Sequence, residues 1–166
     1  MLLWPQVIDA VPDIPVAAAG GIGSGRHIAA ALALGADAAW AGSIWLTTSE
    51  SETIPEVKER LVEAKSEDAV QRRARTGKPV RVLRSKLMDA YESPDAPPIL
   101  KMPLQTATMM ESNLRVERSR NKEWVYSPIG QVVGMMKQQQ SVRQVMYQLL
   151  DEYADTVQRF DHVNAE

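Results

Sequence analysis

The chain has 166 residues, of which 45% are hydrophobic and 24% are charged, and its formal net charge is -2. These values predict one soluble globular domain and argue against general nucleic-acid binding, which needs a basic surface. No apolar run is long enough to span a membrane and no signal peptide is recognisable. The absence of cysteine excludes disulfides and Cys-ligated zinc and fits a reducing, cytoplasmic location.

A strand, a glycine-rich turn, a helix and a second strand are predicted close to the start of the chain. Residues 16–19 and 38–41 are short apolar runs, and residues 26–34 are rich in the helix formers alanine and leucine. Ser24 is placed to cap this helix and Gly35 to end it. The short crossover implies that the two strands are parallel neighbours. The turns that follow them are Gly20–Gly25 and Gly42–Ser43.

Helices dominate the prediction for the rest of the chain. Thr53-Ile-Pro-Glu56 has the pattern of a capping box that opens a helix through about Ala74. A second capping box at Ser141–Gln144 opens an amphipathic helix. After Ser43 no second pair of buried strands is predicted. The remaining expected segments are a short helix at 44–46, an extended basic stretch at 76–84, a proline-rich loop at 93–103 and a helix at 105–116.

The glycine-rich turn predicts a phosphate site, because backbone N–H groups near helix N-termini bind phosphate well. A P-loop is excluded, since Arg26 and His27 stand where it needs Lys and Ser or Thr. The dinucleotide fingerprint fails at Arg26, and a hydrolase elbow around Ser24 fails at Ile22 and Arg26. The order of elements matches the phosphate site after strands 7 and 8 of a (β/α)₈ barrel. Glycines that merely permit tight turns are the alternative.

At these residues the chain resembles the nitronate monooxygenase family, formerly called 2-nitropropane dioxygenases, which are FMN-dependent TIM-barrel enzymes. The resemblance rests on segments spread over nearly the whole chain. Those segments are Ala18–Ile22, Gly35–Ala36, Gly42–Ser43, Thr76–Arg84, Ile129–Gly134 and the helix from Ser141. The phosphate motif is shared with other flavin barrels and with inosine-monophosphate dehydrogenases, and the later segments favour nitronate monooxygenase.

The resemblance implies an α/β fold, a partial TIM (β/α)₈ barrel followed by a mainly helical region. The last two strand–helix units of the barrel would span residues 1–52, and residues 53–166 would pack on them. The family commonly has Gln-Met-Gly-Thr where this chain has Trp40–Ser43, so the glutamine side-chain contact is not expected here. By the resemblance, the FMN phosphate is held by Gly20, Gly21, Ile22, Ala41, Gly42 and Ser43.

The resemblance maps only onto the C-terminal half of the family pattern. The family's catalytic histidine lies in a segment outside this chain, and neither His27 nor His162 is expected to replace it. We therefore expect a fragment that is inactive alone, with no catalytic residue and no metal. The complete enzyme would take an alkyl nitronate and O2, with a separate N-terminal half as a partner and no nucleic acid or membrane. The alternatives are an inosine-monophosphate dehydrogenase-like barrel and a non-catalytic remnant or subunit.

Two other features each allow two interpretations. The basic residues between Arg72 and Lys86 would meet an anionic partner or, as we favour, form a solvated face paired with nearby acids. Trp40 and Trp45 flank the predicted phosphate site, where they would wall a cofactor or pack between the barrel and its helices.

Overall fold

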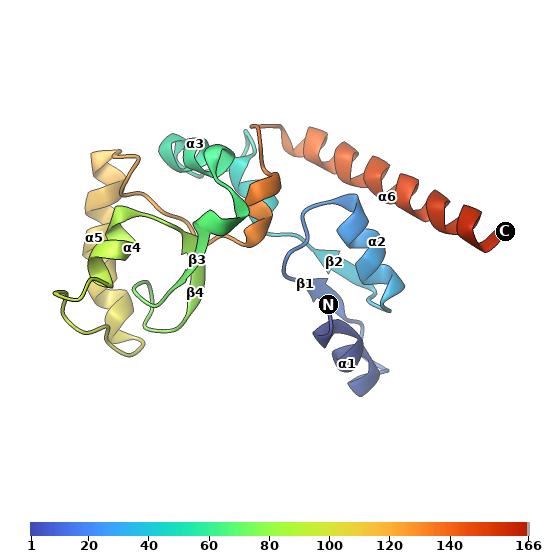
Figure 1. The fold of residues 1–166 in the computed structure, drawn as a ribbon, viewed down its shortest axis with the longest axis horizontal. Coiled ribbons are helices and arrows are strands. Elements are labelled where there is room, and N and C mark those ends of the chain that lie inside the picture. The colour runs from blue at the N-terminus through green and yellow to red at the C-terminus, as the bar shows by residue number, and fades with distance from the viewer. Residues whose placement is uncertain (166) are drawn as a thin grey trace. The chain divides into compact units, whose positions relative to one another are not determined.

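The computed structural model describes the backbone of residues 1–165 and the side chains of residues 1–160. The chain forms two compact units (Figure 1). The first unit comprises residues 1–51 together with the chain from residue 140 onward, and the second unit comprises residues 52–139. The expected boundary near residue 52 coincides with the start of the second unit. The final helix, expected with residues 53–166, is grouped with the first unit instead.

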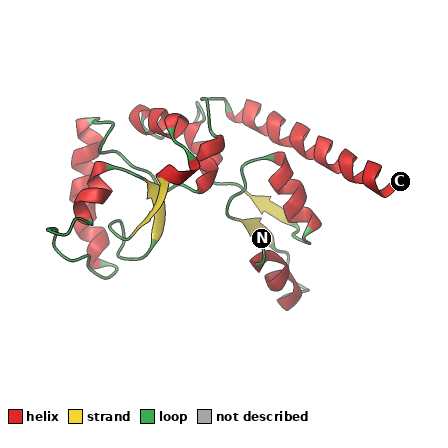
Figure 2. Ribbon diagram, in the orientation of Figure 1, coloured by secondary structure: helices red, strands yellow, loops and turns green. Residues whose placement is uncertain are grey.

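A parallel strand–helix–strand motif forms the centre of the first unit, as predicted (Figure 2). The strands pair in register from Ala17 opposite Ala38 to Ala19 opposite Trp40. The unit is therefore of the α/β class. Its elements are α1 (Leu3–Ala10), β1 (Ala17–Ala19), α2 (Gly25–Ala33), β2 (Ala38–Trp40), the short 3₁₀ helix η1 (Ser43–Thr47) and α6 (Val142–Ala165).

Local signals explain why this motif forms where the sequence predicted it. The Ser24 hydroxyl accepts a hydrogen bond from the His27 amide and caps α2. Gly35 has a φ of +94°, the left-handed conformation that ends a helix and favours glycine. On the inner face, Ala18 and Ile22 are buried in a small apolar core. The cap, the terminating glycine and the core agree, so the motif is locally well specified.

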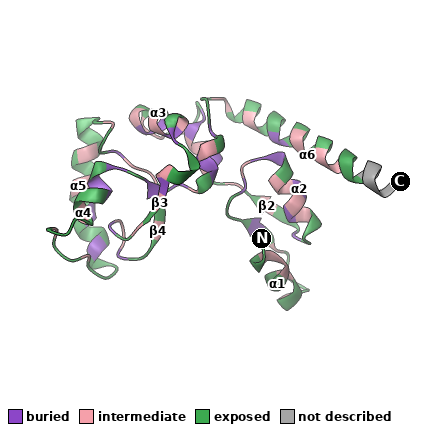
Figure 3. Ribbon diagram, in the orientation of Figure 1, coloured by how far each residue is buried: buried purple, intermediate pink, exposed green. Residues whose placement is uncertain are grey.

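Helix α6 packs against α2 within the first unit. The predicted capping box is confirmed, since Ser141 N donates to Gln144 Oε1 at 2.8 Å and Gln144 N donates to Ser141 Oγ at 3.2 Å. Leu149 is buried, whereas Met146 and Leu150 on the same apolar stripe are exposed. Green, exposed residues accordingly run along much of α6 in Figure 3. Part of the apolar stripe of α6 therefore remains uncovered in this chain.

The second unit contains an antiparallel hairpin among helices. Its strands pair from Ala69 opposite Leu83 to Arg72 opposite Val80. The elements of this unit are α3 (Pro55–Glu63), the 3₁₀ helix η2 (Ser66–Asp68), β3 (Ala69–Arg72), β4 (Val80–Leu83), α4 (Lys86–Tyr91), α5 (Leu104–Ser119) and the 3₁₀ helix η3 (Gln131–Met135).

Two expectations for this region are wrong. The helix predicted from Thr53 to Ala74 ends at Glu63, because residues 69–72 pair with residues 80–83 instead. The expectation of no second strand pair fails for the same reason. Ile54 is the N-cap residue of α3 and makes no side-chain cap hydrogen bond. The proline at the first helical position and the helix at 105–116 are confirmed.

The side chains of Arg60 and Gln105 form hydrogen bonds to backbone groups of the second unit that lie far apart in the sequence. The Arg60 guanidinium donates to the carbonyl oxygens of Val125, at 2.6 Å, and Arg84. The buried Gln105 amide donates to Ala74 O at 2.6 Å and accepts from Leu100 N at 3.0 Å. These side chains satisfy backbone groups that no strand partner reaches, so each holds separate loops in place.

Candidate functional site

The two predicted phosphate-binding turns lie side by side at one edge of the small sheet. Because Ala19 is paired with Trp40, the segments that begin at Gly20 and Ala41 leave neighbouring parallel strands at the same level. Neighbouring strands are about 4.8 Å apart. The structure therefore brings together the two groups of residues that the sequence analysis singled out.

Space is open at the glycines of both turns. Gly20 and Gly21 have φ values of +95° and +78°, so both occupy the left-handed region. Apart from chain neighbours, no described atom lies within 4 Å of a Cβ built on Gly20, Gly21 or Gly42. Each of these residues is exposed, whereas Ile22 is buried in the core beside them. Ile22 can therefore offer only its backbone to a ligand.

The second turn leads directly into a short helix. The 3₁₀ helix η1 begins at Ser43, immediately after Gly42, which confirms the short helix expected at 44–46. Ile44 is buried and fixes this helix on the unit. Trp45, which the sequence placed beside the site, is half-buried and donates its indole N–H to Ala41 O at 2.7 Å. Trp40 points largely into solvent, with 70% of its surface exposed.

The N-terminus of α2 is already satisfied by groups of the chain itself. The Gly25 amide donates to the Glu152 carboxylate of α6 at 2.8 Å, and the His27 amide donates to Ser24 Oγ. A carboxylate at a helix N-terminus is stabilised by the helix dipole, as a phosphate would be. The part of the site near α2 is thus filled by Glu152, and open space lies at the glycines of the two turns.

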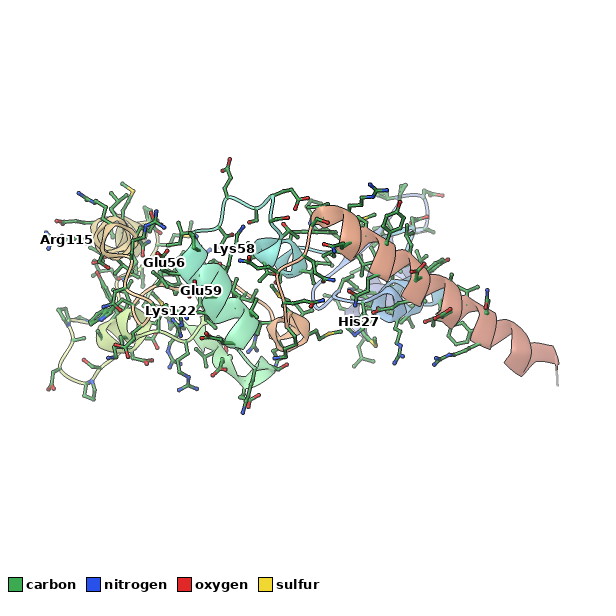
Figure 4. All side chains as sticks on the ribbon, turned by 90° about the horizontal axis from the view of Figure 1, so that it is seen from above. His27, Glu56, Lys58, Glu59, Arg115 and Lys122 are labelled. Carbon is green, nitrogen blue, oxygen red and sulfur yellow. The ribbon has the colours of Figure 1, made fainter. Side chains whose placement is uncertain are left out.

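His27 lies in the first turn of α2 and hydrogen-bonds to the glycine-rich turn before it. Its Nδ1 accepts a hydrogen bond from the Gly23 amide at 3.1 Å, and Figure 4 labels it on α2. The side chain of His162 lies outside the described residues. Among the residues that are described, no cluster of His, Asp or Glu has the arrangement of a metal site.

The basic segment between Arg72 and Lys86 is mostly engaged within the second unit. Arg72 pairs with Asp89 at 2.9 Å, and Lys86 pairs with Glu123 at 2.6 Å. Arg81 donates to Ala69 O at 2.6 Å across the hairpin. These contacts agree with the interpretation of a face paired with nearby acids.

Sequence reasoning missed a cavity in the second unit and the tryptophan at the start of the chain. The cavity has a volume of about 410 Å³, and its lining includes Arg75, Asn113 and Tyr126. Trp4, on α1, donates its indole N–H to Ala19 O at 3.2 Å, directly before the first glycine turn. Neither feature has a sequence motif, because both depend on residues far apart in the chain.

Three known proteins are similar to this chain over nearly its whole length. Rv1533 of Mycobacterium tuberculosis, provisionally named a monooxygenase, is 46% identical over 163 residues, which cover 95% of this chain and 44% of that protein. FabK from Thermotoga maritima has a TM-score of 0.78 and 32% identity, covering 98% of this chain and 51% of FabK. A nitroalkane oxidase from Streptomyces ansochromogenes has the same TM-score and identity, covering 96% of this chain and 44% of the oxidase.

The chain thus spans about half the length of the proteins that it matches. No helix within the described residues is both long and apolar enough to cross a bilayer. The family model for nitronate monooxygenase matches residues 1–152, which include both glycine turns, the hairpin and the N-terminal part of α6. That match decides between the families left open by the glycine motif. The chain belongs to the nitronate monooxygenase family, a family of flavin-dependent oxidoreductases.

Proposed function

We propose that this chain binds the phosphate of FMN between its two glycine turns and supplies the C-terminal half of a nitronate monooxygenase. The observation that carries the proposal is the pair of adjacent, open turns on parallel strands. The donors would be the backbone N–H groups of six residues. Those residues are Gly20, Gly21, Ile22, Ala41, Gly42 and Ser43.

The two turns have room for a phosphate next to their backbone, where no side chain of the described residues fills the space at the glycines. Open space at Gly20, Gly21 and Gly42 lets a ligand approach the backbone closely. The neighbouring anion is the Glu152 carboxylate, which accepts hydrogen bonds from the Gly25 amide and from the Gln148 side chain. It is therefore part of the folded structure around the turn. Backbone amides at such turns are suited to hold phosphate, so this chain's contribution is to bind and orient the cofactor.

The bound FMN would supply the redox chemistry for oxidation of an alkyl nitronate by O2 to a carbonyl compound and nitrite. The rest of the barrel and the catalytic histidine would come from an N-terminal half, because this chain matches only about half of each relative. We expect the chain to form a partial (β/α)₈ barrel in that assembly. Alone, it should bind flavin without oxidising nitronates.

Comparison of FMN with riboflavin, which lacks the phosphate, tests this site directly. The chain should bind FMN about tenfold or more tightly than riboflavin, because one charge-assisted hydrogen bond contributes roughly 1.5–3 kcal/mol. Gly42→Leu should abolish this preference, since it fills open space at a glycine without a positive φ. Ala33→Leu, at an exposed position at the end of α2, is the matched control. Equal affinities for FMN and riboflavin in the unmodified chain would refute the phosphate site.

A second assay tests the role of the proposed N-terminal half. Nitronate consumption and nitrite release are measured with the chain, excess FMN and O2. We expect no turnover above the rate of free FMN. Turnover by the chain alone would contradict the proposal that catalysis needs an N-terminal half.

A further inference from the structure

Both glycine turns are preceded by a backbone carbonyl that an indole N–H holds. Trp4 Nε1 donates to Ala19 O at 3.2 Å, directly before Gly20. Trp45 Nε1 donates to Ala41 O at 2.7 Å, directly before Gly42. The two tryptophans come from different elements, α1 and η1, and yet each donates to the carbonyl that directly precedes a glycine of its turn.

The planarity of the peptide bond gives these contacts a consequence on the other side of the chain. In a trans peptide the carbonyl of one residue and the N–H of the next point in opposite directions. Holding the Ala19 carbonyl therefore fixes the direction of the Gly20 N–H, and holding the Ala41 carbonyl fixes that of the Gly42 N–H. The indole N–H is only a donor, so it selects the orientation in which the carbonyl faces the ring.

Glycine makes such control necessary. A peptide plane next to glycine turns over at low steric cost, because no Cβ opposes the change. After such a flip a carbonyl oxygen would face the ligand in place of an N–H and would repel an anion. The rings are themselves held, since Trp4 packs against the core around Ala18 and Ile22, and Trp45 is half-buried.

We propose that Trp4 and Trp45 are positioning residues that aim the Gly20 and Gly42 amides at the flavin phosphate. This inference rests on the proposed function of the two turns. It assigns to two side chains outside the expected phosphate contacts a role in selecting phosphorylated over unphosphorylated flavin. It also explains why the chain keeps indole rings behind turns whose ligand contacts are made by backbone.

The test replaces each indole by a ring that lacks the N–H. Trp4→Phe and Trp45→Phe keep an aromatic ring but remove the donor together with part of the ring volume, and Trp40→Phe makes the same change at an indole with 70% exposure as the control. The measured quantity is the ratio of the riboflavin and FMN dissociation constants. Each of the two variants should lower this ratio about three- to tenfold, the effect of one neutral hydrogen bond. The control should leave the ratio unchanged.

Several outcomes would overturn the inference. A merely structural role would weaken FMN and riboflavin binding in parallel, so an unchanged ratio with lower affinity for both contradicts positioning. An unchanged ratio with no loss of affinity for either flavin also contradicts the positioning role. Circular dichroism of each variant establishes that the comparison is between folded chains.

A measurement without flavin separates this inference from the phosphate site itself. The indole N–H protons of Trp4 and Trp45 should exchange with solvent at least about tenfold more slowly than that of Trp40, because only the first two are hydrogen-bonded in the structure. Equal exchange rates would refute the positioning contacts whether or not FMN binds. Slow exchange together with equal FMN and riboflavin affinities would instead refute the proposed function and, with it, the role in phosphate selection.

Discussion

The backbone of α6 lies directly against Gly25 of α2, and replacing this glycine by alanine should separate the two helices. A Cβ at this position would overlap the carbonyl oxygen of Leu149 and the backbone nitrogen of Tyr153 and would lie 2.6 Å from Glu152 Cβ. Carbon atoms in ordinary contact are about 3.5–4.0 Å apart. Since two of the atoms met are backbone, the overlap is relieved only if α6 moves outward by about 1 Å.

Two contributions add up in this variant. Overpacking typically costs about 1–3 kcal/mol. The same outward movement stretches the 2.8 Å hydrogen bond from Gly25 N to the Glu152 carboxylate, and a bond to a charged group contributes about 1.5–3 kcal/mol when buried. This pair is only partly buried, so the lower end of that range applies. We expect the free energy of unfolding of the first unit to fall by about 2–4 kcal/mol.

Urea unfolding followed by tryptophan fluorescence measures this change. In a Trp124→Phe background, the remaining tryptophans all belong to the first unit, so the signal reports that unit alone. Gly42→Ala, at an open glycine without a positive φ, is the control and should stay within about 0.5 kcal/mol of the parent. If Gly25→Ala is as stable as this control and the amides of α6 exchange as slowly as before, the close packing of α2 and α6 is refuted.

Two further predictions concern the second unit. Arg60→Met should destabilise it by about 2–3 kcal/mol, because the substitution leaves the carbonyls of Val125 and Arg84 without their donor at a site whose burial also lowers the pKa of Arg60. Arg115→Met, at an exposed ion pair, should change stability by less than about 0.5 kcal/mol in the same urea assay. Equal effects of the two substitutions would contradict the structural role of Arg60. Hydrogen bonds to Glu59 and Glu63 raise the pKa of Lys122 above its ordinary 10.5 (Figure 4 shows Glu59 and Lys122 side by side). Since the folded pKa is the higher one, this stabilisation is complete below about pH 10 and is lost as the pH rises through the folded value; a Lys122→Gln variant should lose less stability than the parent over that range, and identical pH profiles would argue against the ion pairs.

The strand–helix–strand motif was predictable because its signals are local. A capping serine at Ser24, a terminating glycine at Gly35 and two apolar runs all fall within about 30 residues and agree with one another. The same closeness in sequence let the glycine turns be paired in advance, since parallel strands joined by one helix end at the same edge. The binding role predicted for these turns stays a prediction.

The hairpin of the second unit was not predictable in the same way. Gln71, Arg72 and Arg81 give its strands no apolar run of the expected kind. The hairpin is stabilised by distant contacts instead, such as the hydrogen bond from Leu83 N to Ser127 O at 2.9 Å. Trp4 was missed for a related reason. Its partner is a backbone carbonyl, and any residue at position 19 would present the same oxygen.

The points at which the backbone leaves and rejoins the first unit are hydrogen-bonded to each other. Ser49 N donates to Gln140 O at 2.9 Å, and Val142 N donates to the Glu50 carboxylate at 2.9 Å. With the intervening residues unfolded, joining these ends closes a loop of roughly 90 residues, at an entropic cost whose length-dependent part is about 4 kcal/mol. Folding of residues 52–139 into a compact body shortens the effective loop and reduces that cost. Destabilising mutations in the second unit should therefore loosen α6 as well, a coupling carried by chain connectivity that requires no contact between the two.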